Sequence, residues 1–481
     1  MSFKLSTAVK SASILFSISP LGPTIQHLSR KLDTVPRICT MATAARVELT
    51  PETTGVYHTP GITAEAAKVG SELLQKNHDN NHIFFNRSGF HNHIAHHLLT
   101  TFALGATPQQ LQHAFDNNIG YQRPQYPVDT RNVQIMTDRS KFKEFLGKEQ
   151  YFHDYEIFFR KEIEAKGWQA VLNEHLFAGD EHAESLLTRM YAGFYHPIIH
   201  LGFGVEFEQP AIIVEALAQA AIHDNWTAKF LYDAENKAKE GKTPSKSMVQ
   251  LLKDCRANQK IKNSPHFDDP NKVRDGVLVR APNEMIELCS QWRVSPDEIE
   301  KKTAEMINGN AWFAGAAQMP PKQVKFDFFY IHCLNCSIFF DSFLKQKWLS
   351  DENKCRLLEW KGRFDLALYV SRGSPELRQD EITQYEPKHK DDGWHEIIKR
   401  IDAVEDDGHA SKLVRALAHG EVFCKNFESQ YKEEFPVQGD MWLKLGHMAI
   451  DSVEGEHPEG RWVRNCGFSE SWENVPERAR L

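Results

Sequence analysis

The sequence predicts an all-α protein whose chain folds into one large helical domain. From residue 63 onward, apolar residues recur at positions i, i+3, i+4 and i+7, the spacing of a helix with one buried face. The apolar-polar alternation of a half-buried strand is scarce, and Gly and Pro fall mostly between the periodic stretches. These observations favour helices over strands throughout the domain.

Seven stretches show the helical spacing most clearly. The predicted helices are, in chain order, Ala64–Gln75, His91–Leu104, Lys141–Lys166, Glu181–Gly193, Pro210–Asp233, Val324–Leu344 and Ser411–Tyr431. Two polar stretches lie among them. The segment 233–275 is rich in Lys, Asp and Asn and poor in aromatic residues, which predicts a charged, solvent-exposed insertion. A second polar connection is predicted over Ser371–Asp392.

Residues 1–45 differ from the rest and are predicted to form an N-terminal extension to a catalytic domain spanning residues 46–481. The extension is rich in Ser and Thr, and four basic residues precede its first acidic residue, Asp33. This composition fits a mitochondrial presequence, whereas a start at Met41 would make the segment an upstream or disordered extension. We therefore expect a cytoplasmic protein, or a mitochondrial one if residues 1–40 act as a presequence.

Composition argues against two classes of partner. The 481 residues carry a net charge of −8 at pH 7, whereas nucleic-acid binding needs a basic face. No run of 18 uncharged apolar residues occurs, so no membrane span is predicted. The eight Cys show no disulfide framework, and the pair Cys333 and Cys336 lies in an apolar run, which favours buried, reduced thiols. The oligomeric state is left open.

The 23 His residues supply the candidate chemistry, because several lie within apolar helical patterns. Neutral imidazole is the commonest metal ligand, and burial favours the neutral form. In the first cluster, His93 shares a helical face with His96 and with His97, at spacings of three and four residues. A polar helix end with water-facing histidines would explain the same pattern.

The second cluster contains His196 and His200, which are one helical turn apart. Pro197 suits the first turn of the helix that these residues would enter. Histidines that only pack against or cap this helix are the alternative. Gly202 and Gly204 do not form a dinucleotide-binding loop, because no third Gly follows and no strand precedes them.

Two further clusters lie later in the chain. His332 is flanked by aromatic and aliphatic residues, and an unpaired buried polar group costs about 1–3 kcal/mol, so we expect a metal ion or a carboxylate beside it. His409 and Lys412 are three residues apart, hence on one helical face. A lysine fits a metal site only if it is neutral or carboxylated. An exposed, salt-bridged Lys412 is the alternative.

Four motifs around these residues occur in order along the chain. They are Gly89-Phe-His-Asn-His, His196-Pro-Ile-Ile-His-Leu-Gly-Phe-Gly, Glu215-Ala-Leu-Ala-Gln-Ala-Ala-Ile-His-Asp and Asp407-Gly-His-Ala-Ser-Lys-Leu-Val-Arg-Ala-Leu. With these motifs the chain resembles the questin oxidase-like family of fungal secondary metabolism. That family includes anthraquinone ring-opening enzymes and Baeyer–Villiger-type oxidases. The resemblance covers most of residues 50–460.

The resemblance implies a non-haem Fe(II) site in the interior of the helical bundle. Carried over motif by motif, the implied metal ligands are His93, His196, His332, His409 and a carboxylated Lys412. Three further histidines are expected beside the ligands or facing the substrate, as candidate catalytic residues: His97, His200 and His223. The implied reaction is O₂-dependent oxidative ring cleavage of an anthraquinone-like aromatic polyketide.

Three other functions are left open. An NADPH-dependent Baeyer–Villiger monooxygenase would act on the same substrates, but the chain lacks the fingerprints of a flavin site, so no flavin is expected. A helical metallophosphohydrolase is suggested by the His-Asp pairs at 78–79, 153–154 and 223–224, although no basic phosphate clamp lies nearby. The third alternative is a helical scaffold without an active site.

Overall fold

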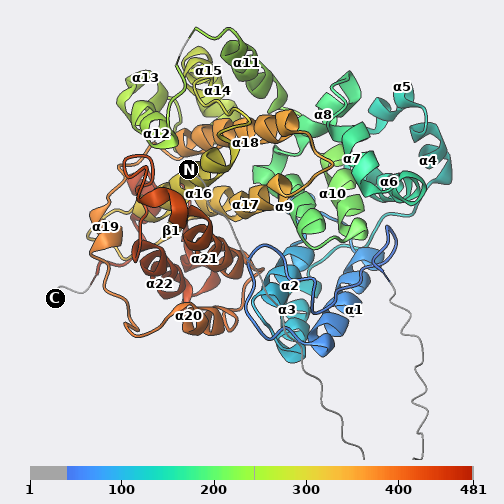
Figure 1. The fold of residues 1–481 in the computed structure, drawn as a ribbon, viewed down its shortest axis with the longest axis horizontal. Coiled ribbons are helices and arrows are strands. Elements are labelled where there is room, and N and C mark those ends of the chain that lie inside the picture. The colour runs from blue at the N-terminus through green and yellow to red at the C-terminus, as the bar shows by residue number, and fades with distance from the viewer. Residues whose placement is uncertain (1–40, 243, 479–481) are drawn as a thin grey trace, which may run out of the picture. The chain divides into compact units, whose positions relative to one another are not determined.

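Helices form nearly all of the regular structure in the computed structural model, which describes residues 41–242 and 244–478 (Figure 1). In this part of the chain the only strands, β1 (Phe326–Asp327) and β2 (Trp462–Val463), are two residues long and pair in parallel. The all-α prediction is therefore confirmed. The presequence interpretation concerns residues 1–40, which lie outside the described residues.

The helices before residue 190 follow one another closely. They are α1 (Ala64–Asn80), α2 (Ile94–Ala103), α3 (Pro108–Ile119), α4 (Thr130–Met136), α5 (Arg139–Phe142), the 3₁₀ turns η1 (Lys143–Phe145) and η2 (Glu149–Tyr151), α6 (Phe152–Lys166), α7 (Trp168–Leu176) and α8 (Glu181–Arg189). The single helix predicted over Lys141–Lys166 is wrong in its first half. Gly147 has a φ of +74°, which ends the helical path before α6 begins.

The remaining elements continue in the same manner. They are α9 (Ala192–Glu206), α10 (Pro210–Ile222), α11 (Ala228–Lys239), α12 (Met248–Ala257), α13 (Gln259–Lys262), the π-turn η3 (Lys272–Val277), α14 (Leu278–Arg280), α15 (Pro282–Cys289), α16 (Ile299–Ala316), α17 (Phe328–Leu344), α18 (Asp351–Ser371), α19 (Asp380–Thr383), α20 (Trp394–Ile401), α21 (His409–Glu428), α22 (Met441–Val453), η4 (Pro458–Gly460) and η5 (Ser469–Trp472). The predicted helix Pro210–Asp233 is broken at His223, whose backbone is extended at the end of α10.

The sequence predicted that the segment 233–275 is solvent-exposed. In the structure, part of this segment is buried. Its helix α12 buries Met248, Leu251, Leu252 and Cys255 and packs against α16 and α18. These four residues are spaced i, i+3, i+4 and i+7, so the sequence contains the pattern of a helix with one buried face, although charged residues surround it.

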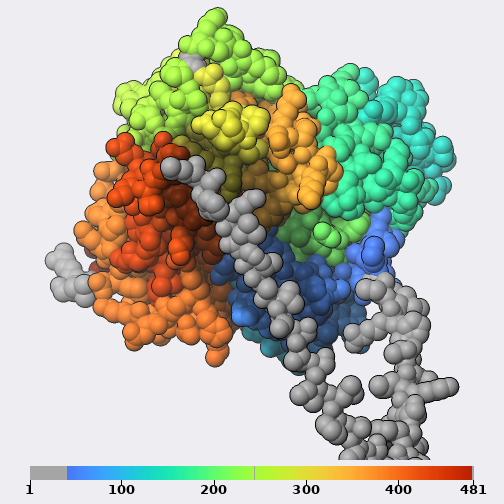
Figure 2. Space-filling view, viewed as in Figure 1, coloured from blue at the N-terminus to red at the C-terminus, as the bar shows by residue number. Residues whose placement is uncertain are grey.

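The core of the described chain is built from α9, α10, α16, α17 and α21. Helix α17 packs against α9, α16, α18 and α21, and α10 is buried along its whole length. Helix α2 contacts both α9 and α21, which brings residues near 100 beside residues near 410. The N-terminal helices, in blue, and the C-terminal helices, in orange and red, meet on the face shown in Figure 2.

Two smaller predictions can be compared with this fold. Cys333 and Cys336 are buried and unpaired within α17, as predicted for reduced packing residues. Gly202 and Gly204 lie inside α9 rather than on a loop, which agrees with rejecting a dinucleotide-binding turn. Among the described helices, none combines the length and the apolarity that a bilayer crossing requires.

Candidate metal centre

The four predicted histidine ligands converge from four different helices. His93 directly precedes α2, His196 lies in α9, His332 in α17 and His409 begins α21. Their side chains are all buried. Because α17 packs against both α9 and α21, and α2 also contacts both of them, the four rings meet in the interior.

The Nε2 atoms of these rings face one another. His93 Nε2 lies 2.7 Å from His196 Nε2, and His409 Nε2 lies 3.2 Å from His332 Nε2. The candidate ligand atoms of His93, His196 and His409 lie within 4.8 Å of one another. The structure therefore brings the four predicted histidines into one cluster.

The opposite ring nitrogens all contact oxygen acceptors. His93 Nδ1 lies 2.7 Å from one oxygen of Asp407, and His409 Nδ1 contacts the other oxygen of the same carboxylate. The Nδ1 atoms of His196 and His332 lie 2.5 and 2.6 Å from the backbone carbonyl oxygens of Gly193 and Phe328. A carbonyl or carboxylate oxygen can only accept, so each Nδ1–H donates and each Nε2 keeps its lone pair.

This arrangement fits a bound metal ion. Nε2 lone pairs that face one another at short distance repel unless a cation lies between them. Protons do not supply that charge, because burial lowers the pKa of His93, His332 and His409 to about 3. Several imidazole nitrogens backed by oxygen acceptors are a donor set that suits first-row transition metals, iron included.

Lys412 lies one helical turn beyond His409 and is buried, with 6% of its surface exposed. Its Nζ makes no hydrogen bond or ion pair with any described residue, so the exposed, salt-bridged alternative is wrong. Burial lowers the pKa of Lys412 to about 8, against the opposing effect of the Asp407 and Asp406 carboxylates. A substantial share of this lysine is thus neutral near physiological pH.

The three predicted catalytic histidines lie around the cluster rather than inside it. His200 contacts His96 Nε2 through Nδ1 at 3.0 Å and Glu215 through Nε2 at 2.7 Å. His223 Nε2 lies 2.9 Å from His91 Nε2. His97 is buried, and its Nδ1 lies 3.4 Å from the side-chain amide of Asn118.

Several residues of this centre were not among the predicted site residues. His91 stacks on His196 with ring centroids 3.8 Å apart, and Glu215 joins His200 to His78 Nδ1 at 2.6 Å. Asp407 is the most consequential, because it holds two of the candidate ligand rings at once. Its place in a quoted motif, two residues before His409, was the available signal.

Buried histidines other than the four candidate ligands predict that the protein loses stability in acid. Burial lowers the pKa of His97 and His175 to about 4 and that of His223 to about 3. The unfolded chain, with pKa values near 6.5, takes up protons first as pH falls. Their contribution is complete above about pH 6.5 and declines toward the folded pKa, by roughly 1 kcal/mol per group and pH unit.

Urea unfolding at pH 7.5, 6.5 and 5.5 measures this loss. We expect the free energy of unfolding to fall by several kcal/mol in total between pH 6.5 and 5.5. In a His175→Phe variant the fall should be smaller by about 1 kcal/mol. Equal stability at all three pH values would contradict the prediction.

Fold and site together define a helical protein with a buried, histidine-rich candidate metal centre. The questin oxidase-like family model matches residues 90–417, a stretch that holds all five predicted ligands. The chain therefore belongs to the questin oxidase-like family, as its motifs predicted.

Three fungal relatives show how far the similarity extends. The chain is 42% identical over 442 residues to the Baeyer-Villiger oxidase ptaJ of Pestalotiopsis fici, covering 90% of this chain and 99% of the relative. It is 40% identical over 439 residues to a questin oxidase of Aspergillus terreus, covering 90% and 98%. It is also 40% identical over 437 residues to the Baeyer-Villiger monooxygenase dmxR6 of Cryptosporiopsis sp., covering 89% and 98%.

Proposed function

We propose that this protein is an oxidoreductase of secondary metabolism that cleaves a ring of an anthraquinone-like aromatic polyketide with O₂ at a non-haem iron site. The observation that carries the proposal is the convergence of four imidazole Nε2 atoms whose opposite nitrogens all donate to oxygen. The names of the relatives, questin oxidase and Baeyer-Villiger oxidase, support oxidative chemistry on such substrates.

The residues that would hold the iron are the four clustered histidines together with Lys412. When bound, Fe(II) would supply the one-electron chemistry that makes O₂ reactive toward an organic molecule. Asp407 keeps the Nδ1 protons of His93 and His409 in place, so that both Nε2 atoms stay available as ligands. Removal of this carboxylate would free two rings to change tautomer.

We further propose that Lys412 is carboxylated. The neutral amine attacks CO₂, a new N–C bond forms, and one proton leaves the nitrogen, which gives an anionic carbamate. Burial favours this step because it favours the neutral amine, and no described carboxylate pairs with Nζ to hold it as a cation. The carbamate would add an oxygen donor to four nitrogens, a mixed set that suits iron.

Aromatic side chains border the cluster and would favour a planar substrate. The Phe328 ring lies 4.8 Å from that of His332 and 4.9 Å from that of His409, measured between centroids. Phe328 is only partly buried, and the Arg464 guanidinium lies over its ring, 4.5 Å from the centroid. We infer that substrate approaches on this side, where a flat polyketide would displace Arg464 and stack on the ring.

An NADPH-dependent Baeyer–Villiger monooxygenation on the same substrates is the second candidate, because two relatives are named for Baeyer-Villiger oxidation and one of these is called a monooxygenase. The two reactions differ in stoichiometry. The monooxygenase consumes one NADPH for each O₂, whereas the ring-cleaving dioxygenase consumes none. Of the His-Asp pairs that suggested a phosphohydrolase, only His78 lies in a metal-capable group among residues 41–242 and 244–478, with Glu156 and Glu215. None of the paired aspartates lies in such a group, and we do not propose that activity.

Anaerobic reconstitution with Fe(II), followed by O₂-uptake assays on a panel of anthraquinones, tests the proposal. We expect one tightly bound iron per chain and substrate-dependent O₂ uptake without NADPH. Uptake that requires NADPH in a one-to-one ratio would favour the monooxygenase. Protein that binds no iron and consumes no O₂ with any substrate would contradict both.

A further inference from the structure

A strained turn directly precedes the ligand His196. Gly193, Phe194 and Tyr195 have φ values of 54°, 56° and 73°, all in the left-handed region. This conformation costs roughly 1–2 kcal/mol for each residue with a side chain, and it persists only where the surroundings enforce it. Because His196 Nδ1 also bonds to the Gly193 carbonyl, the turn sets the direction of the His196 ring.

The turn is anchored through Tyr195 to a buried ion pair on α18. The fully buried Tyr195 donates its hydroxyl hydrogen to Asp365 Oδ1 at 2.7 Å. Both oxygens of Asp365 lie 2.5 Å from Lys361 Nζ, and both side chains of this pair are fully buried. The Lys361 ammonium also lies 4.7 Å from the centre of the Tyr195 ring.

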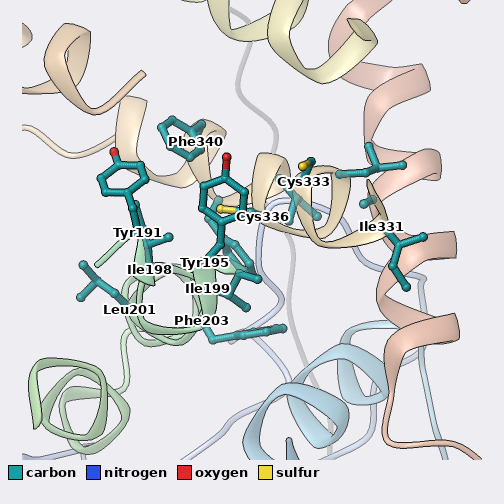
Figure 3. Close-up of a cluster of buried hydrophobic side chains, with 14 of the residues drawn as sticks. Tyr191, Tyr195, Ile198, Ile199, Leu201, Phe203, Ile331, Cys333, Cys336 and Phe340 are labelled. Carbon is teal, nitrogen blue, oxygen red and sulfur yellow. The ribbon is translucent and has the colours of Figure 1, made fainter. Parts of the chain in front are cut away.

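The same ion pair adjoins the helix that carries a second ligand. Helix α18, which carries the pair, packs against α17, and Cys333 directly follows His332 in α17. The Cys333 backbone carbonyl in turn accepts a hydrogen bond of 3.1 Å from Asn310 on α16. Figure 3 shows Tyr195 of α9 close to Cys336 and Cys333 of α17.

Stability alone does not account for this ion pair. Removing two charges from water costs several kcal/mol per ion, and well-packed apolar residues of similar volume are often equally or more stabilising. A buried charge pair is most useful where it enforces one particular geometry. Here it lies next to two ligand-bearing segments, one of which is strained.

We propose that Tyr195, Asp365 and Lys361 are positioning residues that hold His196 in the direction needed to bind the metal ion. The inference rests on the metal site of the proposed function. It predicts that loss of the Tyr195 hydroxyl makes the protein lose its metal ion markedly faster while the Tm falls only slightly.

Tyr191 provides a matched control for Tyr195. It is also fully buried on the same segment, and its hydroxyl also donates to α18, to the Leu357 carbonyl oxygen at 2.8 Å. Tyr191 precedes the turn, with an ordinary φ of −92°. Both hydroxyl groups point to the same side in Figure 3. Tyr191→Phe removes one buried hydroxyl bond, and Tyr195→Phe removes the bond to Asp365 together with a longer contact of 3.3 Å to the Lys361 carbonyl oxygen. Only Tyr195→Phe releases the turn.

The experiment compares iron loss from Fe(II)-loaded wild type, Tyr195→Phe and Tyr191→Phe on addition of a chelator. We expect loss from Tyr195→Phe to be about tenfold faster than from wild type, and loss from Tyr191→Phe to stay within about twofold. Co(II) in place of Fe(II) gives an absorption spectrum that should change only in Tyr195→Phe. Both variants should show similar small decreases in Tm.

The doubly substituted Lys361→Met/Asp365→Val protein removes both charges and changes the packing volume by only about one methylene group. We expect it to fold with a Tm near that of wild type and to lose iron as fast as Tyr195→Phe. Equal iron loss from Tyr195→Phe and Tyr191→Phe would overturn the positioning role and leave the iron site intact. Wild type that retains neither Fe(II) nor Co(II) would overturn the metal site, and the inference with it.

Discussion

The His409→Ala variant is expected to lose most of its iron and at least about 100-fold of its turnover. His409 presents Nε2 to the cluster and is held by Asp407 on its other side, so its removal deletes one ligand and leaves the carboxylate with a single imidazole partner. Loss of a residue that only supports a ligand typically costs 10–100-fold in metal affinity or activity. Loss of the ligand itself should exceed that range.

The same helix offers a control for the burial of a histidine. His419 lies in α21, is buried, and has its Nε2 3.1 Å from Asp341 Oδ2, but it takes no part in the cluster. His419→Ala should lower the Tm about as much as His409→Ala and keep iron and turnover. Millimolar imidazole should partly restore His409→Ala by occupying the vacated space. Full turnover of His409→Ala without added imidazole would exclude a ligand role.

The general position of this centre could be predicted from the sequence because its parts lie in recognisable segments. His332 lies in an apolar helix, and His409 and Lys412 share one helical face, so local spacing identified them. The resemblance then selected one histidine from each of the four clusters. Helix α17, which carries His332, begins four residues later than the apolar pattern suggested, because β1 takes the preceding residues.

The links between these segments could not be predicted. Asp407 and His93 are 314 residues apart, and nothing in their local patterns indicates that one carboxylate would serve two rings. The left-handed turn is a similar case, because Phe194 and Tyr195 are residue types that rarely adopt positive φ. The helical pattern continued to Gly193 instead. Such features depend on tertiary contacts, here with the buried pair on α18.

Replacing Lys412 by Met is expected to keep or raise stability while it abolishes most turnover. Wild-type Lys412 places an amine in the interior with no hydrogen-bond or ion-pair partner among the described residues, and burying such a group is costly. Met has a similar volume and no polar atom, so the fold should tolerate it. If the carbamate supplies a metal ligand, the variant loses one anionic donor and should bind iron at least tenfold more weakly.

Lys412→Arg separates a ligand from a buried cation. Arg stays charged and cannot be carboxylated, and two unit charges 4 Å apart repel by about 4 kcal/mol at an effective dielectric constant of 20. We therefore expect Lys412→Arg to exclude the metal ion altogether. Lys302→Arg is the control, because Lys302 is equally buried but pairs with Glu305 at 3.0 Å, and it should retain iron.

Carbon dioxide provides the direct measurement of the modification. Wild type loaded in ¹³C-labelled bicarbonate should show a carbamate carbon signal that is absent from Lys412→Met. Since the pKa of Lys412 is lowered to about 8, the neutral amine and hence the carbamate should increase as pH rises from 7 to 8.5. Over the same pH range, iron loading should be lower in CO₂-free buffer than in bicarbonate buffer. If the Lys412→Met variant binds iron and turns over substrate as well as wild type, the carbamate is excluded. Lys412 would then be only a packing residue, and the four imidazoles would suffice to bind the iron.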